Sequence, residues 1–530
     1  MNESTIKKGS RACRGMNYKF LVCVFASFQL FSQKESSISI NLAQEKTAIS
    51  PMMYGQFIEY LGRCIDGGIY EEGSPLSDEN GFRKDVLQSV KALDIPIMRF
   101  PGGTVTKIYN WKDGIGDTAA RPTRKNLIWG GTIDNHFGTA EFIKYCRLIG
   151  AEPFLVVNMA TDTPMSAAEW VEYCNSSEDT YWANLRRSHG YEEPFNVKYW
   201  GLGNEEYAEP DAGIHQNVND YIKDSWHFLK LMKLQDTTIK IAVVGSAEDL
   251  SWSREVVKEM HPAIDFLSVH FFSMPWDDSY KTLLKSVDMY AKSLDSLRVV
   301  LADAPDDVSD FSRWYRFPSR QNKLTLAIDE WSIWDMKSNK GKGDYQMEYD
   351  YNWAQALVVA KFLNMFQRNA DIIGFATWAQ TVNVLAPIMS TPEGSYKQTI
   401  YTPLHAYRHL SKGNYLPIEA ISSVSNEAPK CLDVTATISD DGSQIVVAII
   451  NVSEKESNSM EFNFDNLGNG KKMQLVEQRN FTSTSLEAVS TMNKDVVIET
   501  KNTKLVDVKK KIVLEVPAAS INFYAFEIQK

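Results

Sequence analysis

Eight short apolar runs alternate with amphipathic stretches over roughly 350 residues of this 530-residue chain, and this alternation constrains the fold most. Each run has the length and composition of a strand that is buried on both faces. The stretches between them carry apolar residues at helical spacing, as at Val86, Val90 and Leu93 in a helix expected at 80–93. The expected strands are 52–61, 95–100, 153–158, 195–200, 239–244, 265–270, 324–328 and 372–378.

Strands that alternate with helices fit two α/β folds, a (β/α)₈ TIM barrel and a doubly wound open sheet. The number of strand–helix pairs favours the barrel, which we expect to span residues 50–412. Beyond it the helical periodicity is lost, and Ser439–Ser443 is a hairpin signal between two runs rich in β-branched residues. We therefore expect a C-terminal all-β sandwich at 413–530. Residues 36–49 have no place in the barrel and are expected to join the sandwich as a strand.

The first 33 residues are typical of an export signal. Basic residues precede an apolar run, Phe20–Phe31, that suits a signal peptide and is too short to span a bilayer. A buried first strand or helix is the alternative, which the basic flank disfavours. We therefore expect a signal peptide at 1–33 and an exported protein, periplasmic or secreted, without a membrane span. The later cysteines are too widely spaced for a disulfide framework and favour free thiols: Cys64, Cys146, Cys174 and Cys431.

The remaining patterns exclude several functional classes. A formal net charge of −11 disfavours a nucleic-acid partner, because phosphate binding requires a basic face. Gly201-Leu202-Gly203 begins like a dinucleotide-binding motif, but Glu206 occupies the position of its third glycine. His405 and His409 lack the glutamate that a zinc-protease helix carries beside its first histidine. We expect neither a cofactor nor a metal.

Two of the expected strands end in a carboxylate. Glu205 follows the fourth strand and Glu330 follows the seventh. The carboxyl ends of barrel strands carry catalytic residues, and hydrolysis of a glycosidic bond uses two carboxyl groups. Ordinary surface glutamates are the alternative, but the tryptophans beside both residues favour catalysis. Glu206 competes with Glu205, because adjacent side chains at a strand end point in opposite directions.

Gly203-Asn204-Glu205 and Asp329-Glu330-Trp331 resemble the acid/base and nucleophile motifs of glycoside hydrolase family 51, the α-L-arabinofuranosidases. Further motifs match in the same order: 55–59 with 61–63, 98–103 with 109–111, and 379–380 with 382–383 and 386–388. The resemblance covers most of the chain. It implies the same fold, a TIM barrel with a C-terminal β-sandwich, and a homo-oligomer.

The resemblance also implies a retaining enzyme that releases α-L-arabinofuranosyl residues from the non-reducing ends of plant polysaccharides or oligosaccharides. Glu205 would be the general acid/base and Glu330 the nucleophile. We expect the charge of Glu330 to raise the pKa of Glu205. The implied substrate-binding residues are Glu59, Arg99, Asn204, His270 and Gln380, with Asn204 on the sugar 2-OH. Trp111 and Trp129 either wall the sugar subsite or belong to the core, and Arg99 could instead be a structural partner of Glu59.

Two positions depart from the family pattern. Thr104 stands where the family usually has Asn, and Phe272 stands where it usually has Tyr. Both changes affect the sugar pocket, so the glycone stays open. A β-xylosidase or endoglucanase of the same family, and a barrel that binds carbohydrate without hydrolysing it, are the alternatives.

Overall fold

The structure is a computed structural model that describes residues 34–207, 214–274, 277, 279–334, 346–423, 431–467 and 471–529. The expected signal peptide lies outside these residues. Within them, no helix combines the length and the apolar character required to cross a bilayer.

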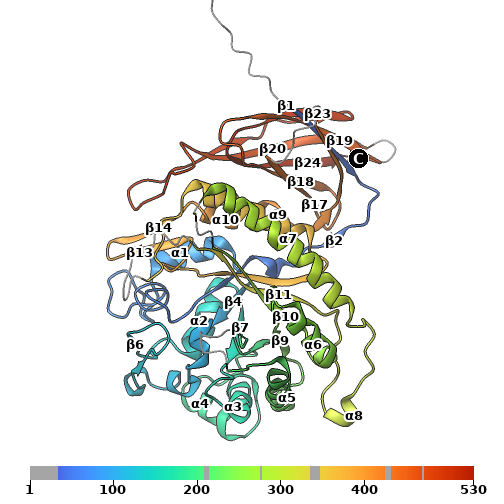
Figure 1. Ribbon diagram of the computed structural model, residues 1–530. Coiled ribbons are helices and arrows are strands. Elements are labelled where there is room, and N and C mark those ends of the chain that lie inside the picture. The colour runs from blue at the N-terminus through green and yellow to red at the C-terminus, as the bar shows by residue number, and fades with distance from the viewer. Residues whose placement is uncertain are drawn as a thin grey trace, which may run out of the picture. The chain divides into compact units, whose positions relative to one another are not determined.

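Eight parallel strands close into a barrel, as expected from the sequence (Figure 1). Strand β12 pairs with β3, and this pairing closes the ring. The strands, in chain order, are β3 (Gly55–Phe57), β4 (Ile97–Phe100), β7 (Glu152–Val157), β8 (Tyr199–Leu202), β9 (Lys240–Val244), β10 (Phe266–Ser273), β11 (Thr325–Ile333) and β12 (Ile373–Ala379).

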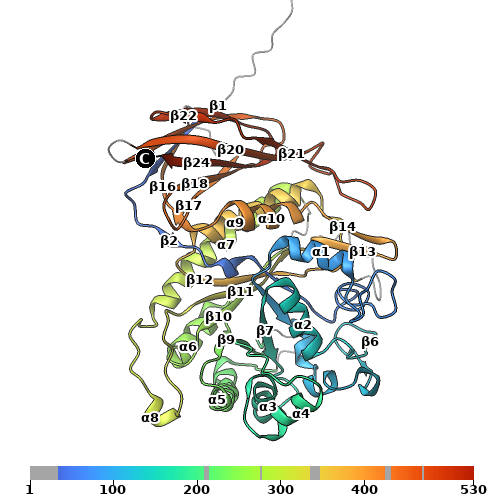
Figure 2. The same ribbon diagram turned by 180° about the vertical axis from the view of Figure 1, so that it is seen from behind.

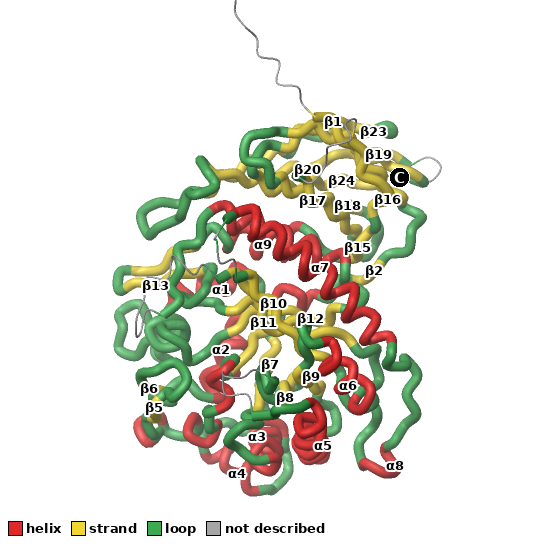
Figure 3. Tube along the Cα trace, in the orientation of Figure 1, coloured by secondary structure: helices red, strands yellow, loops and turns green. Residues whose placement is uncertain are grey.

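Helices follow most of the barrel strands and cover the barrel from outside (Figure 3). Each buries the stripe that its periodicity predicts; α1, for example, buries Val86, Val90 and Leu93. The described helices are α1 (Lys84–Leu93), α2 (Thr139–Ile149), α3 (Pro164–Asn175), α4 (Tyr181–Ser188), α5 (Val218–Gln235), α6 (Leu250–Met260), α7 (Tyr280–Ala302), α8 (Ser312–Tyr315), α9 (Trp353–Arg368) and α10 (Tyr401–Leu410). Short 3₁₀ helices are η1 (Pro51–Tyr54), η2 (Thr104–Lys107), η3 (Trp111–Gly114) and η4 (Thr118–Ala120), and two hairpins are β5 (Arg124–Lys125) with β6 (Thr132–Ile133) and β13 (Ile388–Thr391) with β14 (Gly394–Lys397).

Several predicted boundaries were wrong for local reasons. The helix expected from Asn80 begins at Lys84, because the Asp78 carboxylate accepts the backbone N–H groups of Asn80 and Phe82 in a turn. The strand expected at 195–200 begins at Tyr199 and includes Gly201. Its first part is bound to α3 instead, since the Asn175 side chain accepts the N–H of Val197.

The rest of the described chain forms two β-sheets. One has the order β16-β1-β19-β23, and the larger one follows β2-β15-β17-β18-β24-β20-β21, with β22 on β20. Residues of both sheets share one apolar cluster, including Ile40 and Phe462 from the first and Val447 and Phe526 from the second. The strands are β1 (Lys34–Asn41), β2 (Thr47–Ala48), β15 (Asn414–Leu416), β16 (Ile418–Ser423), β17 (Leu432–Ile438), β18 (Gln444–Asn451), β19 (Asn458–Asp465), β20 (Lys472–Ser483), β21 (Val497–Asn502), β22 (Val506–Val508), β23 (Lys511–Val516) and β24 (Ser520–Gln529).

The C-terminal sheets contact the barrel through α9 and α10, which lie beside β17 and β18 in both views (Figure 2). Tyr407 of α10 packs edge-on against Phe523 of β24 at 5.1 Å between ring centroids. Thr435 of β17 donates to the side-chain oxygens of Asn364 and Gln367 on α9. The barrel and the sheets therefore share a buried interface. The limits 50–412 and 413–530 between them stay a prediction.

Candidate active site

The turn after β8 and the C-terminal half of β11 bring Glu205 and Glu330 together; β11 runs to Ile333, so Glu330 lies inside the strand that was expected to end before it. A carboxylate oxygen of each and a ring nitrogen of His270 lie within 4.8 Å of one another. His270 stands directly opposite Glu330 in the pairing of β10 with β11, so the sheet register itself places the two side chains together. Its Nδ1 lies 2.7 Å from Glu205 Oε1, and its Nε2 lies 3.8 Å from Glu330 Oε1. One histidine thus lies between the two predicted catalytic carboxylates.

The turn after β8 decides which of two adjacent glutamates faces the pocket. Gly203 has a φ of 77° and Glu205 a φ of 43°, both in the left-handed region. Glu206 is fully buried, accepts the N–H of Asn204 at 3.1 Å and lies 3.1 Å from His215 Nδ1. Glu206 therefore stabilises the turn through its buried hydrogen bonds, and Glu205 is the glutamate that lines the pocket.

Glu205 and Glu330 both line a pocket of about 260 Å³. Glu59 organises its floor: it accepts from Trp129 Nε1 at 3.0 Å and from Gln380 Nε2 at 2.9 Å. Among the described residues, Gln380 Oε1 and Asn204 Nδ2 are buried without a hydrogen-bond partner. A buried unpaired polar atom costs about 1–3 kcal/mol, so a ligand hydroxyl would be stabilised there. The residues that line the pocket are Phe57, Glu59, Leu61, Thr104, Trp129, Glu205, Phe272, Met274, Glu330, Trp334, Met347, Ala379, Gln380 and Leu385.

Four predicted substrate-binding residues are not among those that line this pocket: Arg99, Trp111, Asn204 and His270. Arg99 is fully buried beneath it and donates to Glu330 Oε1 at 2.8 Å and to Asn204 Oδ1 at 2.5 Å. It therefore contacts both of these side chains, and it is not hydrogen-bonded to Glu59. Trp111 lies in the core, stacked on Trp170 at 5.8 Å. Its indole N–H is already bound to Ser166, so of the two tryptophans considered only Trp129 reaches the pocket.

The two departures from the family pattern both fall on the pocket wall. Thr104 and Phe272 line it. Phe272 packs edge-on against Trp334 at 5.8 Å between ring centroids, beside the half-exposed Met274. One wall of the pocket is therefore apolar, whereas the floor with Glu59 and Gln380 is polar.

Electrostatics reverse one expectation from the sequence. Burial lowers the pKa of His270, but the charge of Glu330 and hydrogen bonds to Asp329 and Glu205 outweigh it and raise that pKa to about 10. Burial raises the pKa of Glu205, but the hydrogen bond and the charge of His270 lower it below its usual value. Burial, only partly opposed by His270 and Arg99, raises the pKa of Glu330. The prediction of a raised pKa for Glu205 was therefore wrong, because the hydrogen bond and the positive charge of His270 outweigh burial.

Sequence patterns missed three residues at this site. Lys107 ends η2, is 1% exposed, and donates from Nζ to the backbone oxygen of Glu205 at 3.1 Å. Asp329 accepts from Ser268 and lies 3.5 Å from His270 Nε2. His215 holds Glu206. Asp329 was part of the nucleophile motif but was not predicted as a site residue. No spacing rule links Lys107 or His215 to the catalytic strands, and a lysine after an apolar strand is normally a surface residue.

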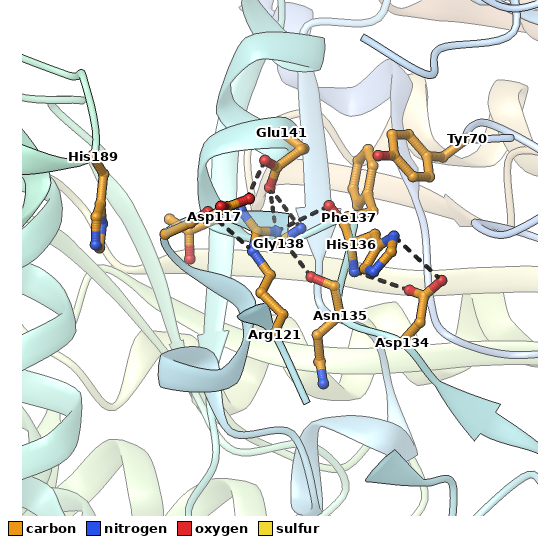
Figure 4. A network of polar contacts seen from close by, with 12 residues as sticks. Tyr70, Asp117, Arg121, Asp134, Asn135, His136, Phe137, Gly138, Glu141 and His189 are labelled. Carbon is orange, nitrogen blue, oxygen red and sulfur yellow. Dashed lines mark hydrogen bonds and ion pairs between the residues drawn. The ribbon is translucent and has the colours of Figure 1, made fainter. Parts of the chain in front are cut away.

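A second polar network holds the segment that carries Trp129 (Figure 4). Arg121 binds Glu141 through two nitrogens at 2.9 and 3.0 Å, and donates to the backbone oxygens of Asn135 and His136. Glu141 in turn accepts the N–H of Gly138 and caps α2. Arg121 therefore connects the residues before β5 and after β6 to the N-terminus of α2. Trp129 lies in the loop that joins β5 to β6.

Comparison with known proteins agrees with this geometry. Residues 89–292 match the model of the α-L-arabinofuranosidase 1 domain, and residues 329–520 match that of the α-L-arabinofuranosidase C-terminal domain. A probable α-L-arabinofuranosidase C of Aspergillus clavatus is 37% identical over 457 residues, which cover 82% of this chain and 88% of the relative. An intracellular exo-α-(1→5)-L-arabinofuranosidase of Halalkalibacterium halodurans is 33% identical and covers 78% of this chain and 84% of the relative. The solved structure of the thermostable GH51 α-L-arabinofuranosidase from Thermotoga petrophila has a TM-score of 0.79 at 33% identity, over 93% of this chain and 99% of that one.

Proposed function

This chain belongs to the α-L-arabinofuranosidases of glycoside hydrolase family 51, and on that premise we propose that it is a retaining enzyme that releases non-reducing-end α-L-arabinofuranosyl residues from plant polysaccharides or oligosaccharides. One observation carries the proposal. The oxygens of Glu205 and Glu330 lie within 4.8 Å of one another at a pocket of about 260 Å³. Carboxyl groups about 5 Å apart suit retention, whereas inversion needs a wider gap that admits water.

In the first step Glu330 attacks the anomeric carbon and the glycosidic C–O bond breaks. The departing oxygen takes a proton from Glu205, which receives it from His270 through the hydrogen bond of 2.7 Å and is left ionised at the end of the step. Arg99 donates to Glu330 and holds its carboxylate toward the sugar. The product is a glycosyl ester on Glu330, and the negative charge of Glu330 is consumed.

In the second step Glu205 acts as the base. It removes a proton from water, the hydroxide attacks the anomeric carbon, and the ester electrons return to Glu330. The floor of the pocket supports binding of a small polar sugar. The unpaired Asn204 Nδ2 and Gln380 Oε1 offer a donor and an acceptor for its hydroxyl groups.

Azide rescue tests the two roles. Glu330→Ala is expected to abolish turnover of an aryl arabinofuranoside, and azide is expected to restore release of the aryl group with an arabinosyl azide of inverted configuration. Glu205→Ala with azide is expected to give the retained azide, because the nucleophile is still present. Unchanged activity in Glu330→Ala would overturn the assignment of the nucleophile.

A panel of aryl glycosides tests the glycone. Hydrolysis of the arabinofuranoside and not of the xyloside or glucoside is the expected result. Binding of arabino-oligosaccharides without release of arabinose would instead favour a non-catalytic carbohydrate-binding barrel. We further propose that the enzyme is exported, supported by the basic flank and apolar run of residues 1–33. Amino-terminal sequencing of the mature protein, and its location in fractionated cells, test this.

A further inference from the structure

Lys107 ties together the segments that follow three neighbouring barrel strands. It lies at the end of η2, after β4. Its backbone oxygen accepts from Thr161 Oγ1 at 2.9 Å, after β7, and its Nζ donates to the Glu205 backbone oxygen at 3.1 Å, after β8. The side chain is 1% exposed. Lysine is almost never fully buried without a partner, since removing its ammonium from water is costly.

The group that Lys107 holds is the backbone of the residue proposed as acid/base. Glu205 has a φ of 43°, in a region where a side chain other than glycine costs about 1–2 kcal/mol. The turn is held from two sides, because Glu206 accepts the N–H of Asn204 while Lys107 donates to the carbonyl of Glu205. A strained turn persists only where surrounding contacts determine it.

Lys107 also adds a positive charge beside this carboxyl. Within the described residues, the charged groups that act on Glu205 include His270, Lys107 and Arg99, with Glu330 as the neighbouring acid. His270 must share its proton with the reaction, and Arg99 is engaged by Glu330 and Asn204. Lys107 touches Glu205 itself and carries no proton that the mechanism uses.

We propose, on the basis of the function proposed above, that Lys107 is a positioning residue for Glu205: its ammonium fixes the backbone of the acid/base and places a positive charge near its carboxyl. The consequence depends on the leaving group. Departure of an alcohol or a sugar needs proton donation from a correctly placed Glu205, whereas departure of 4-nitrophenolate needs little.

The test compares Lys107→Met with Lys107→Arg, which keeps the charge and a donor. For Lys107→Met, kcat/KM on arabino-oligosaccharides is expected to fall at least about tenfold, a fraction of the 10²–10⁴ that acid–base catalysis supplies, and on 4-nitrophenyl arabinofuranoside by no more than about threefold. Loss of the positive charge favours the protonated form of the acid, so the alkaline limb of the kcat/KM profile should move to higher pH. For Lys107→Arg, the alkaline limb of the kcat/KM profile should stay at the wild-type pH.

Lys233→Met is the matched control. Lys233 is 6% exposed and also donates to a backbone oxygen, that of Ile239, ahead of β9 and away from the carboxyl ends of the strands. It should lower the melting temperature without moving the pH limb or changing the ratio between the two substrates. A Lys107→Met variant that behaves like this control, with equal losses on both substrates and an unmoved limb, would overturn the proposal.

A second readout does not depend on turnover. The ¹³C signal of the Glu205 carboxyl, assigned through Glu205→Gln, should titrate at higher pH in Lys107→Met than in the wild type, and an equal midpoint would contradict the proposal. If the wild type hydrolyses no arabinofuranoside, the proposed function fails, while this titration still decides whether Lys107 acts on Glu205.

Discussion

His270 gives the site a pH-dependent contribution to stability. Its pKa rises from 6.5 to about 10 on folding, so the folded protein binds this proton more tightly than the unfolded chain. That contribution is complete below pH 6.5 and is lost as the pH rises through 10. The loss of melting temperature caused by His270→Asn should therefore be largest at pH 6 and shrink steadily toward pH 10.

His189→Asn is the control for this titration. Burial lowers the pKa of His189, so its contribution is constant above pH 6.5 and is lost only on acidification. Its effect on melting temperature should not change between pH 7 and 10. A pH-independent effect of His270→Asn over the same range would contradict the protonated state of His270.

At the scale of residues, the candidate catalytic carboxylates could be predicted from the sequence, whereas the contacts between side chains could not. Glu205 and Glu330 were found because each lies within a few residues of the end of an apolar run, and a barrel brings all such ends to one face. The bond between His270 and Glu205 joins residues 65 positions apart and depends on ring orientation. That bond and the charges of His270, Lys107 and Arg99 lower the pKa of Glu205, so a prediction based on Glu330 alone had the wrong sign.

At the scale of elements, the turn after β8 should be intolerant of a side chain at Gly203. A Cβ there would lie 2.5 Å from Glu206 Oε1, and φ is 77°. Glu206 would have to move and release the N–H of Asn204. We expect Gly203→Ala to lower kcat about 100-fold, the loss that a displacement of about 1 Å at a catalytic group produces.

Gly190→Ala separates this displacement from simple backbone strain. Gly190 has a φ of 90°, but a Cβ there would meet nothing within 4 Å. Both substitutions carry a cost of about 1–2 kcal/mol for the left-handed conformation, and only Gly203→Ala disturbs Glu205. Comparable kcat values for the two variants, measured with 4-nitrophenyl arabinofuranoside, would show that the turn does not position the acid/base.

Element boundaries illustrate what a periodic pattern can and cannot predict. The alternation of runs predicted eight parallel strands and the closed barrel, because burial on both faces leaves a strong signal. The first expected strand, 52–61, is reduced to β3 (Gly55–Phe57), because Ser50 and Pro51 start η1 and Ile58–Leu61 leave the sheet. Such endings depend on caps and tertiary hydrogen bonds, which carry no periodicity.

At the scale of the whole molecule, a buried polar network joins the barrel to the C-terminal sheets. Thr435 Oγ1 is the shared donor, to Asn364 Oδ1 at 2.8 Å and to Gln367 Oε1 at 2.9 Å, and all three side chains are fully buried. Asn364 is also bound to Asp433, and Arg368 pairs with Asp433 at 2.5 Å. Thr435→Val keeps the shape but removes the hydroxyl, whose single proton these two acceptors share, at a cost of about 1–3 kcal/mol.

Helix α9 connects β11 to β12 of the barrel, whereas Thr435 belongs to the C-terminal sheets. The substitution should therefore weaken the contact between the barrel and the sheets and leave catalysis unchanged. Calorimetry of Thr435→Val should show a lower melting temperature and a broader transition, with the sheets unfolding ahead of the barrel, while kcat at 25 °C is unchanged. Thr435→Ser, which loses a methyl group but keeps the hydroxyl, should retain one cooperative transition. If Thr435→Ser is destabilised as much as Thr435→Val, packing of the methyl group, and not the network, couples the two parts.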